Sequence, residues 1–316
     1  MFKTVNSFLG LVFCGALLLS DSSNAFANEQ GTDRSSIEWL QTQVNIGEIL
    51  GDEILISDSL EKLLQIAPNH LLAKATQVQV LLNRDEARQA LRIFRQLEQE
   101  FPNHKQVKRL KLLINLKQDT DARRQYESAK LFALTGKVVQ AIDAYEAVFS
   151  AGFPSIFYEL EYYKLLSRDD AHYDKAIVGI TRLTQRYPGV GDFELQKARI
   201  ILRKTPNSKA AISVLKRYAK TDRYKFEVEG LWLNTLASLE LEKRTDKQYR
   251  DFLRLFPKSM QGKLQYEAFQ KDHAAYKKLL KNPGYQAYLA AVNALDNEES
   301  EKGHRLLKKA LSLIHI

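Results

Sequence analysis

Apolar residues recur at helical spacing along almost the whole chain from Ile37 onward. Segments such as SLEKLLQIAP and QALRIFRQLEQEFP place them three and four positions apart, which is the pattern of an amphipathic α-helix. No convincing run of alternating apolar and polar residues predicts a strand. Prolines follow the amphipathic runs, as expected just past a helix end, at positions 68, 102, 154, 188 and 257. The pattern therefore predicts an all-α chain.

The helical pattern also repeats at a fixed interval. An Ala-Ile pair begins at Ala141, Ala176 and Ala211, with 35 residues between successive copies, and Ala90 begins a similar segment. Paired helices with a period of about 34 residues are typical of tetratricopeptide repeats. We therefore predict an all-α tetratricopeptide-repeat solenoid, a right-handed superhelix built from divergent helix-turn-helix units.

The repeat assigns packing roles to particular residues. Small residues let paired helices approach closely, and a large residue four positions later fills the space between units. The stretch LTGKVVQAIDAYEAVF shows this pattern, with a glycine at the predicted turn between its two helices. The residues predicted to pack the repeats are Ala90, Phe94, Gly136, Ala141, Tyr145, Ala176, Ile180, Ala211 and Leu215.

The pattern divides the chain into four segments. We expect a signal peptide at 1–27, a regular array of about five helix pairs at 28–220, less regular helical pairs at 221–283, and a further repeat at 284–316. In the first unit, GDEILIS is expected to connect a helix over IEWLQTQVNIGEIL to one over SLEKLLQIAP. The chain stops inside an apolar helix without a capping unit, so we expect a truncated product.

The N-terminal segment has the layout of a secretory signal. One lysine precedes a short apolar core, and a polar tract ends in Ala25 and Ala27, which predicts cleavage after Ala27. Cys14 is the only cysteine, so the mature chain would hold no disulfide and no thiolate site. We therefore expect a periplasmic protein that is held together by packing alone.

Composition and charge narrow the function further. Only 14 glycines and 7 prolines occur in 316 residues, which disfavours a turn-rich β protein. The net charge of +9 fits a solvated basic helix surface, and contact with anionic lipid or an acidic polymer is the alternative. An exported chain makes nucleic acid an unlikely partner.

No motif for catalysis or metal binding stands out. Gly189 and Gly191 lack the third glycine of a phosphate-binding loop, and the six histidines are dispersed. We expect these histidines to be solvated or to cap helices, and Asp169 and Asp170 to cap a helix as well. The sequence predicts no catalytic residue, no metal and no cofactor, and so a protein that is not an enzyme.

One helix carries the candidate binding residues. Registering the repeat on Gly136 places Arg123, Tyr126 and Lys130 on the concave face of the array. A tyrosine flanked by cations could stack on and hydrogen-bond a polymer or a peptide. The alternative is ordinary packing between repeats with a solvated basic edge, and it applies equally to Tyr162 and Tyr163.

The order of four segments resembles a known family. SLEKLLQIAPNH, TGKVVQAIDAYEAVFSAGFP, LEYYKLLS and GDFELQKARIILRKTPNSKAAISVLKRYA are similar to the N-terminal periplasmic part of bacterial cellulose synthase operon protein C. The resemblance runs with gaps from Ile37 to Ala310.

The resemblance implies a periplasmic scaffold for exopolysaccharide secretion. Its partners would be the proteins of an inner-membrane polysaccharide synthase complex, with glucan or peptidoglycan as further ligands. Family members are longer and end in an outer-membrane β-barrel, which would associate the full-length protein with the outer membrane. No strand pattern of that kind occurs in this sequence.

Two other functions stay open on the sequence alone. One is a general periplasmic scaffold for protein–protein interactions, serving envelope assembly or the export of another polysaccharide. The other is an envelope enzyme, which the missing catalytic constellation disfavours.

Overall fold

The computed structural model describes residues 31–241 and 243–314, which form helices and no strand. The signal peptide predicted for 1–27, with Ala25 and Ala27, lies outside these residues. The helices are α1 (Gly31–Leu50), α2 (Glu53–Ile66), α3 (Leu71–Asn83), α4 (Ala87–Glu100), α5 (Lys105–Lys117), α6 (Asp121–Leu134), α7 (Val138–Val148), α8 (Ile156–Leu166), α9 (Tyr173–Arg186), α10 (Gly191–Lys204), α11 (Lys209–Tyr218), α12 (Asp222–Ala237), α13 (Lys243–Leu255), α14 (Met260–Leu280), α15 (Pro283–Asp296) and α16 (Ser300–Ile314).

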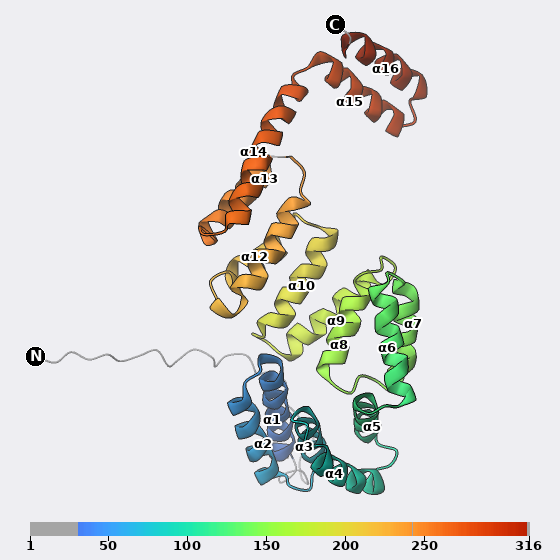
Figure 1. The fold of residues 1–316 in the computed structure, drawn as a ribbon, viewed down its shortest axis with the longest axis vertical. Coiled ribbons are helices and arrows are strands. Elements are labelled where there is room, and N and C mark those ends of the chain that lie inside the picture. The colour runs from blue at the N-terminus through green and yellow to red at the C-terminus, as the bar shows by residue number, and fades with distance from the viewer. Residues whose placement is uncertain (1–30, 242, 315–316) are drawn as a thin grey trace, which may run out of the picture.

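Neighbouring helices pair as antiparallel hairpins that stack into a curved array (Figure 1). The pairs are α1–α2, α3–α4, α6–α7, α8–α9, α10–α11, α12–α13 and α15–α16. Helix α5 is a single helix inserted between the second and third pairs, packing on α3, α4 and α6. This extra helix explains why Pro102 and Pro154 lie further apart than one repeat.

The core runs along the array because each pair buries its apolar face against the next. One cluster joins α5 to α10, a second joins α10 to α14, and smaller clusters fill the first five helices. The small and large repeat positions lie inside these clusters, each at most 7% exposed, and they are Ala90, Phe94, Ala141, Tyr145, Ala176, Ile180, Ala211 and Leu215. Gly136 lies at the exposed turn between α6 and α7 with a φ of +79°.

Histidines and acids cap helices at several turns. In the two Pro-Asn-His segments, the Nδ1 atoms of His70 and His104 accept the backbone N–H groups of Leu72 and Gln106, both at 3.2 Å. These contacts satisfy amides that the first turns of α3 and α5 leave unpaired. Asp169 similarly accepts the backbone N–H of His172, the residue before α9, at 3.1 Å.

The first hairpin differs from the sequence expectation. Helix α2 begins at Glu53, so most of GDEILIS is helical instead of forming the connection. The Asp52 carboxylate accepts the backbone N–H of Leu55 at 3.0 Å and caps the helix. Ile56, in the first turn, is 5% exposed and packs with Val44 in the core. The cap and the buried isoleucine together start the helix six residues earlier than Ser59.

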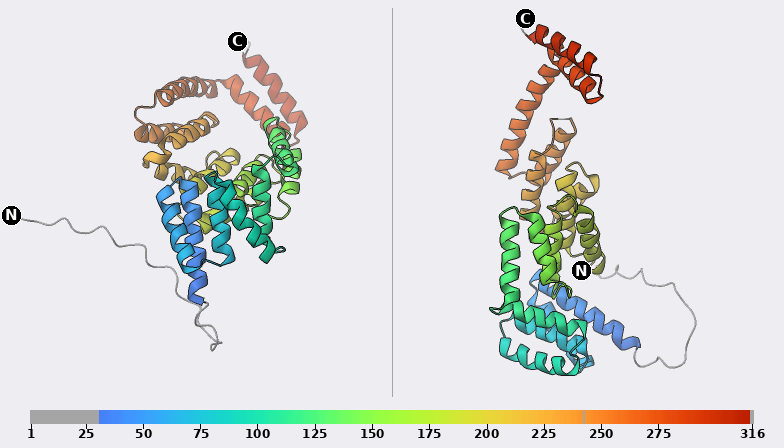
Figure 2. Two further views of the ribbon diagram at one scale, coloured as in Figure 1. Left: turned by 60° about the horizontal axis from the view of Figure 1, so that its bottom comes forward. Right: turned by 90° about the vertical axis from the view of Figure 1, so that its right-hand side faces the viewer.

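The array curls far enough for its first helix to contact much later ones. The Asn45 amide donates to the Tyr187 hydroxyl at 3.3 Å, and the Arg223 guanidinium donates to the Leu50 carbonyl at 2.8 Å. Ile46 and Ile49 pack against the apolar cluster of α5–α10. The end of α1 therefore meets α9 and α12 across the curve, as two views of the ribbon show (Figure 2).

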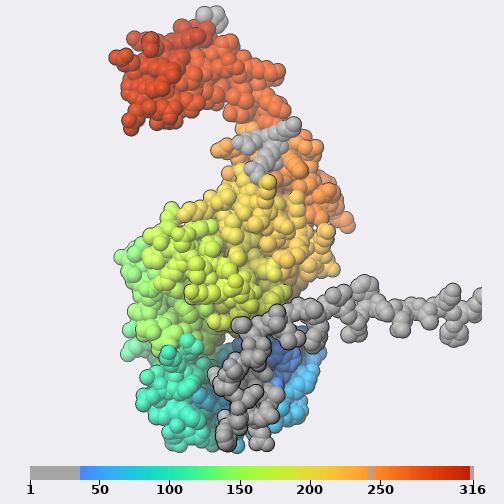
Figure 3. All heavy atoms as spheres, turned by 180° about the vertical axis from the view of Figure 1, so that it is seen from behind, coloured from blue at the N-terminus to red at the C-terminus, as the bar shows by residue number. Residues whose placement is uncertain are grey.

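The C-terminal hairpin stands away from the rest of the chain (Figure 3). Helix α14 spans 21 residues, and its buried residues are Gly262 and Phe269, both in its first half. Helices α15 and α16 pack mainly on each other and meet the preceding chain through α14. Within the described residues, we find no helix with the length and apolar content needed to span a bilayer.

Candidate interaction surface

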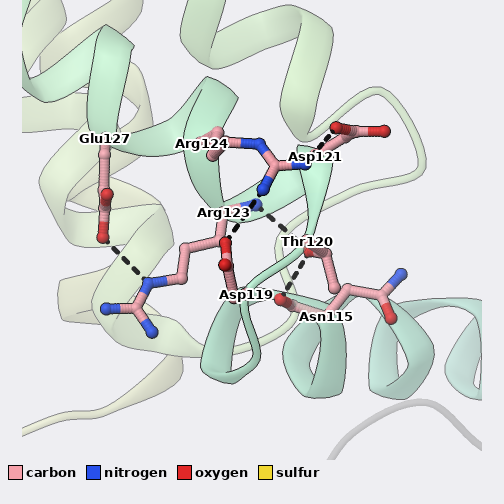
Figure 4. A network of polar contacts seen from close by, with 7 residues as sticks. All are labelled: Asn115, Asp119, Thr120, Asp121, Arg123, Arg124 and Glu127. Atoms are coloured by element: carbon pink, nitrogen blue, oxygen red, sulfur yellow. Dashed lines mark hydrogen bonds and ion pairs between the residues drawn. The ribbon is translucent and has the colours of Figure 1, made fainter.

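The start of α6 is an ordered polar turn around the candidate residue Arg123 (Figure 4). Thr120 caps the helix through its hydroxyl, which accepts the Arg123 N–H and donates to the Asn115 carbonyl at 2.8 Å. The Arg123 guanidinium pairs with Glu127 at 2.9 Å on the same exposed helix face. Arg123 is therefore exposed, but its charge is already paired locally.

Tyr126 points between helices instead of outward. Its hydroxyl donates to Glu161 on α8 at 2.5 Å, and its ring meets those of Tyr145 and Tyr158 edge-on, at 5.8 and 5.4 Å. Burial, followed by the hydrogen bond to Glu161, raises the pKa of the Tyr126 phenol. The Lys130 ammonium lies 5.4 Å from the centre of the ring and is exposed.

Glu161 joins three helices through tyrosine hydroxyls. It accepts the hydroxyl of Tyr145 on α7 at 2.8 Å as well as that of Tyr126. Tyr162 and Tyr163 are also largely buried, at 5% and 9% exposure. Tyr126 thus contributes to packing between repeats, and of the three candidates only Arg123 and Lys130 present side chains to solvent. Ligand binding by these three residues stays a prediction.

A larger recess lies where α8, α10 and α12 follow one another in the array (Figure 1). It encloses about 900 Å³ and is lined by the first helix of three successive hairpins. Two basic residues enter it from α8 and the turn that follows, Lys164 and Arg168, and two from α10, Arg199 and Arg203. Helix α12 adds the 90% exposed Phe226.

The recess carries an excess of positive charge. Its one acidic lining residue, Glu227, pairs with Arg199 at 2.7 Å. Arg168 and Arg203 have no ion-pair partner among the residues that the structure describes. Desolvation between the helices, followed by the nearby Arg199, lowers the pKa of the Lys164 ammonium.

Gln196 is the buried polar residue of this recess that has no partner. Its side chain is 7% exposed and makes no hydrogen bond to any described residue. A buried amide without a partner loses hydrogen bonds to water and gains none in return. Because Gln196 lines the recess, a bound ligand could supply these bonds.

Sequence analysis missed this recess. Its signal is a pair of basic residues one helical turn apart, Lys164 and Arg168, and a second pair on α10, Arg199 and Arg203. Each pair alone is typical of a solvated helix face. Only the stacking of the hairpins shows that the pairs line one recess. In the described part of the chain, no group of three or more His, Cys, Asp or Glu side chains could hold a metal ion.

Comparison with known proteins identifies relatives for this array. The chain is 24% identical over 284 residues to cellulose synthase operon protein C of Salmonella typhimurium, which covers 89% of the chain and 23% of that protein. It is 26% identical over 221 residues to the protein of the same name from Xanthomonas axonopodis pv. citri, covering 69% of the chain and 15% of that protein. The chain thus spans less than a quarter of the length of these curated relatives. No family model matches it.

A solved structure has the same architecture. The crystal structure of the flexible tandem repeat domain of the corresponding bacterial cellulose synthase component aligns with a TM-score of 0.50 and 24% identity, covering 78% of this chain and 98% of that one. This likeness confirms the predicted all-α tetratricopeptide-type solenoid. The predicted resemblance is confirmed as well: most of this chain is similar to cellulose synthase operon protein C.

Proposed function

We propose that the chain is a non-enzymatic scaffold for the synthesis and export of cellulose. The observation that carries the proposal is the similarity to cellulose synthase operon protein C across 89% of the chain. A stacked helical array suits a scaffold because it presents an extended surface and can hold several partners at once.

The scaffold would act in the periplasm after removal of residues 1–27. Its partners would be proteins of an inner-membrane polysaccharide synthase complex, with contact to glucan or peptidoglycan as a further role. In a longer protein the array would connect that complex to an outer-membrane barrel. The recess between α8, α10 and α12 is the proposed docking surface, since it combines four cations with an amide that has no partner. The exposed charges of Arg123 and Lys130 form a second, smaller surface.

An in-frame deletion of residues 31–314 in the source organism tests the proposal. We expect cellulase-digestible glucan in the medium and on the cell surface to fall sharply. Glucan synthesis by isolated membranes should stay unchanged, because a scaffold supplies no catalytic residue. Expression of the intact gene from a plasmid should restore secretion.

Unchanged secreted cellulose in the deletion strain would contradict the proposal. If another exported polymer were lost instead, the chain would be a scaffold for that polymer. Loss of synthesis in isolated membranes would show that the array takes part in the polymerising reaction itself.

A further inference from the structure

The chemistry of the recess between α8, α10 and α12 points to one class of ligand. We infer that it docks an extended acidic segment of a partner protein, and not a glucan chain. The inference rests on the proposed scaffold function and specifies the partner chemistry of its docking surface.

Charge is the first reason. The recess has four cations, Lys164, Arg168, Arg199 and Arg203, against the single carboxylate of Glu227. Like charges held together by the fold repel one another, and an anionic ligand relieves that repulsion while gaining a faster encounter. Arg168 and Arg203 have no ion-pair partner among the described residues, so both are available to carboxylates. A neutral glucan would leave these charges uncompensated.

Spacing is the second reason. Lys164 and Arg168 lie four residues apart, which on a helix is a rise of about 6 Å. Arg199 and Arg203 have the same spacing on α10. In an extended chain, alternate residues lie about 6.6 Å apart and point to the same side. A peptide with acidic residues at alternate positions can therefore place successive carboxylates beside successive cations.

The amides of the recess fit a peptide backbone. A carboxamide both donates and accepts, which matches the N–H and C=O of a peptide group. Gln196 is buried without a partner, and Asn234 lines the same recess from α12. Hydroxyl groups of a sugar could meet the same amides, so the cations decide between the two ligands.

An apolar patch completes the recess. Phe226 is 90% exposed, and Ile200 and Leu231 line the wall beside it. A large exposed aromatic at the edge of a recess is typical of a surface that a ligand covers. The residues between the acidic positions of the peptide would then be apolar. The expected motif alternates acidic and apolar residues.

Fluorescence anisotropy with defined probes tests this inference. The probe is a labelled Glu-Phe-Glu-Ala-Glu peptide, compared with Gln-Phe-Gln-Ala-Gln, with cellohexaose and short polygalacturonate as competitors. We expect the intact chain to bind the glutamate peptide at least tenfold more tightly than the glutamine peptide. Arg168→Gln/Arg203→Gln should weaken binding at least tenfold, and added salt should weaken it in the wild type.

Two further variants separate a specific recess from general electrostatics. Arg88→Gln/Arg92→Gln removes two exposed arginines without ion pairs from α4, so it changes the net charge equally. It should alter binding by less than twofold. Gln196→Leu keeps a similar side-chain volume but removes the hydrogen-bonding groups, and should weaken binding threefold or more with an unchanged salt dependence. Circular dichroism checks that each variant is folded.

Several results would overturn the inference. They are an absence of wild-type binding at about 1 mM peptide, near the weak limit of specific recognition, and equal losses in the α4 and recess variants. Displacement of the peptide by cellohexaose would assign the recess to glucan, and stronger displacement by polygalacturonate would assign it to an acidic polysaccharide. Peptide binding is measured without cellulose, so its failure is distinguishable from a failure of the secretion experiment.

Discussion

Replacing Gly179 with alanine tests whether the close approach of α8 and α9 limits the side chain at this position. A Cβ atom at Gly179 would lie 2.1 Å from Cε1 and 2.3 Å from Cζ of Tyr163. Ordinary contact begins at 3.4 Å, so the ring would have to move by about 1.3 Å, the difference between these distances. Tyr163 is 9% exposed, and its hydroxyl donates to Glu159 at 3.0 Å. The ring therefore has little room to move.

Two opposing effects set the size of the change. Alanine is favoured over glycine inside a helix by about 1 kcal/mol, whereas overpacking a core typically costs about 1–3 kcal/mol. Because the clash is with a ring that neighbours hold in place, we expect overpacking to win and stability to fall by about 1–2 kcal/mol. Gly230 is the matched control, a helical glycine at which an added Cβ would meet no neighbouring atom within 4 Å. Gly230→Ala should stabilise by up to about 1 kcal/mol.

Urea unfolding followed by circular dichroism measures both variants. With a slope of about 3 kcal/mol/M, the midpoint of Gly179→Ala should fall by about 0.5 M. Midpoints are compared directly, since repeat arrays can depart from two-state unfolding. Tyr163→Leu in the Gly179→Ala background should cost less than the sum of the two single changes, because a smaller side chain makes room. A midpoint for Gly179→Ala at or above that of the wild type would refute the reasoning.

Three further changes have defined outcomes in the same unfolding experiment. Gly136→Ala should destabilise by about 1 kcal/mol, because its φ of +79° is unfavourable for alanine, and Gly136→Asn should cost less; equal midpoints would contradict this. Tyr145→Phe should cost about 0.5–1.5 kcal/mol by removing the hydroxyl that donates to Glu161 at 2.8 Å, and no cost would show that this hydrogen bond adds nothing. Lys216 hydrogen-bonds Asp251 at 2.6 Å and lowers the pKa of the Asp251 carboxyl, so this contribution is complete above the unfolded value of about 3.9 and is lost as pH falls below it. The midpoint difference between wild type and Asp251→Asn should therefore be constant from about pH 7 to 5 and close below about pH 4, and a difference independent of pH would contradict the assignment.

Local patterns predicted the architecture because each repeat is built from local rules. Proline positions marked the ends of helices, and the Ala-Ile period marked one side of each hairpin. The early start of α2 was missed although its signal was present, since Asp52 is a good N-cap residue directly before an apolar run. The single helix α5 was missed because nothing in a helical pattern says whether a helix will find a partner.

Contacts between distant repeats were beyond sequence reasoning. Tyr126 has the composition of a binding residue, but the way α6, α7 and α8 stack turns its ring toward Glu161. The recess requires α8, α10 and α12 to be placed side by side, and the contact of Arg223 with Leu50 spans 173 residues. These features depend on the rotation between successive hairpins, which many small packing differences set together.

The sparse packing of α14 gives the C-terminal hairpin the mechanics of a lever. A helix of 21 residues is about 30 Å long, so a turn of about 10° at its base moves its far end by about 5 Å. That base is held mainly by Phe269 against Tyr249, with ring centres 5.2 Å apart, and by Gly262 beside Phe252. A modest repacking of these few side chains would therefore change the distance between the recess and the α15–α16 hairpin far more than it changed any local contact.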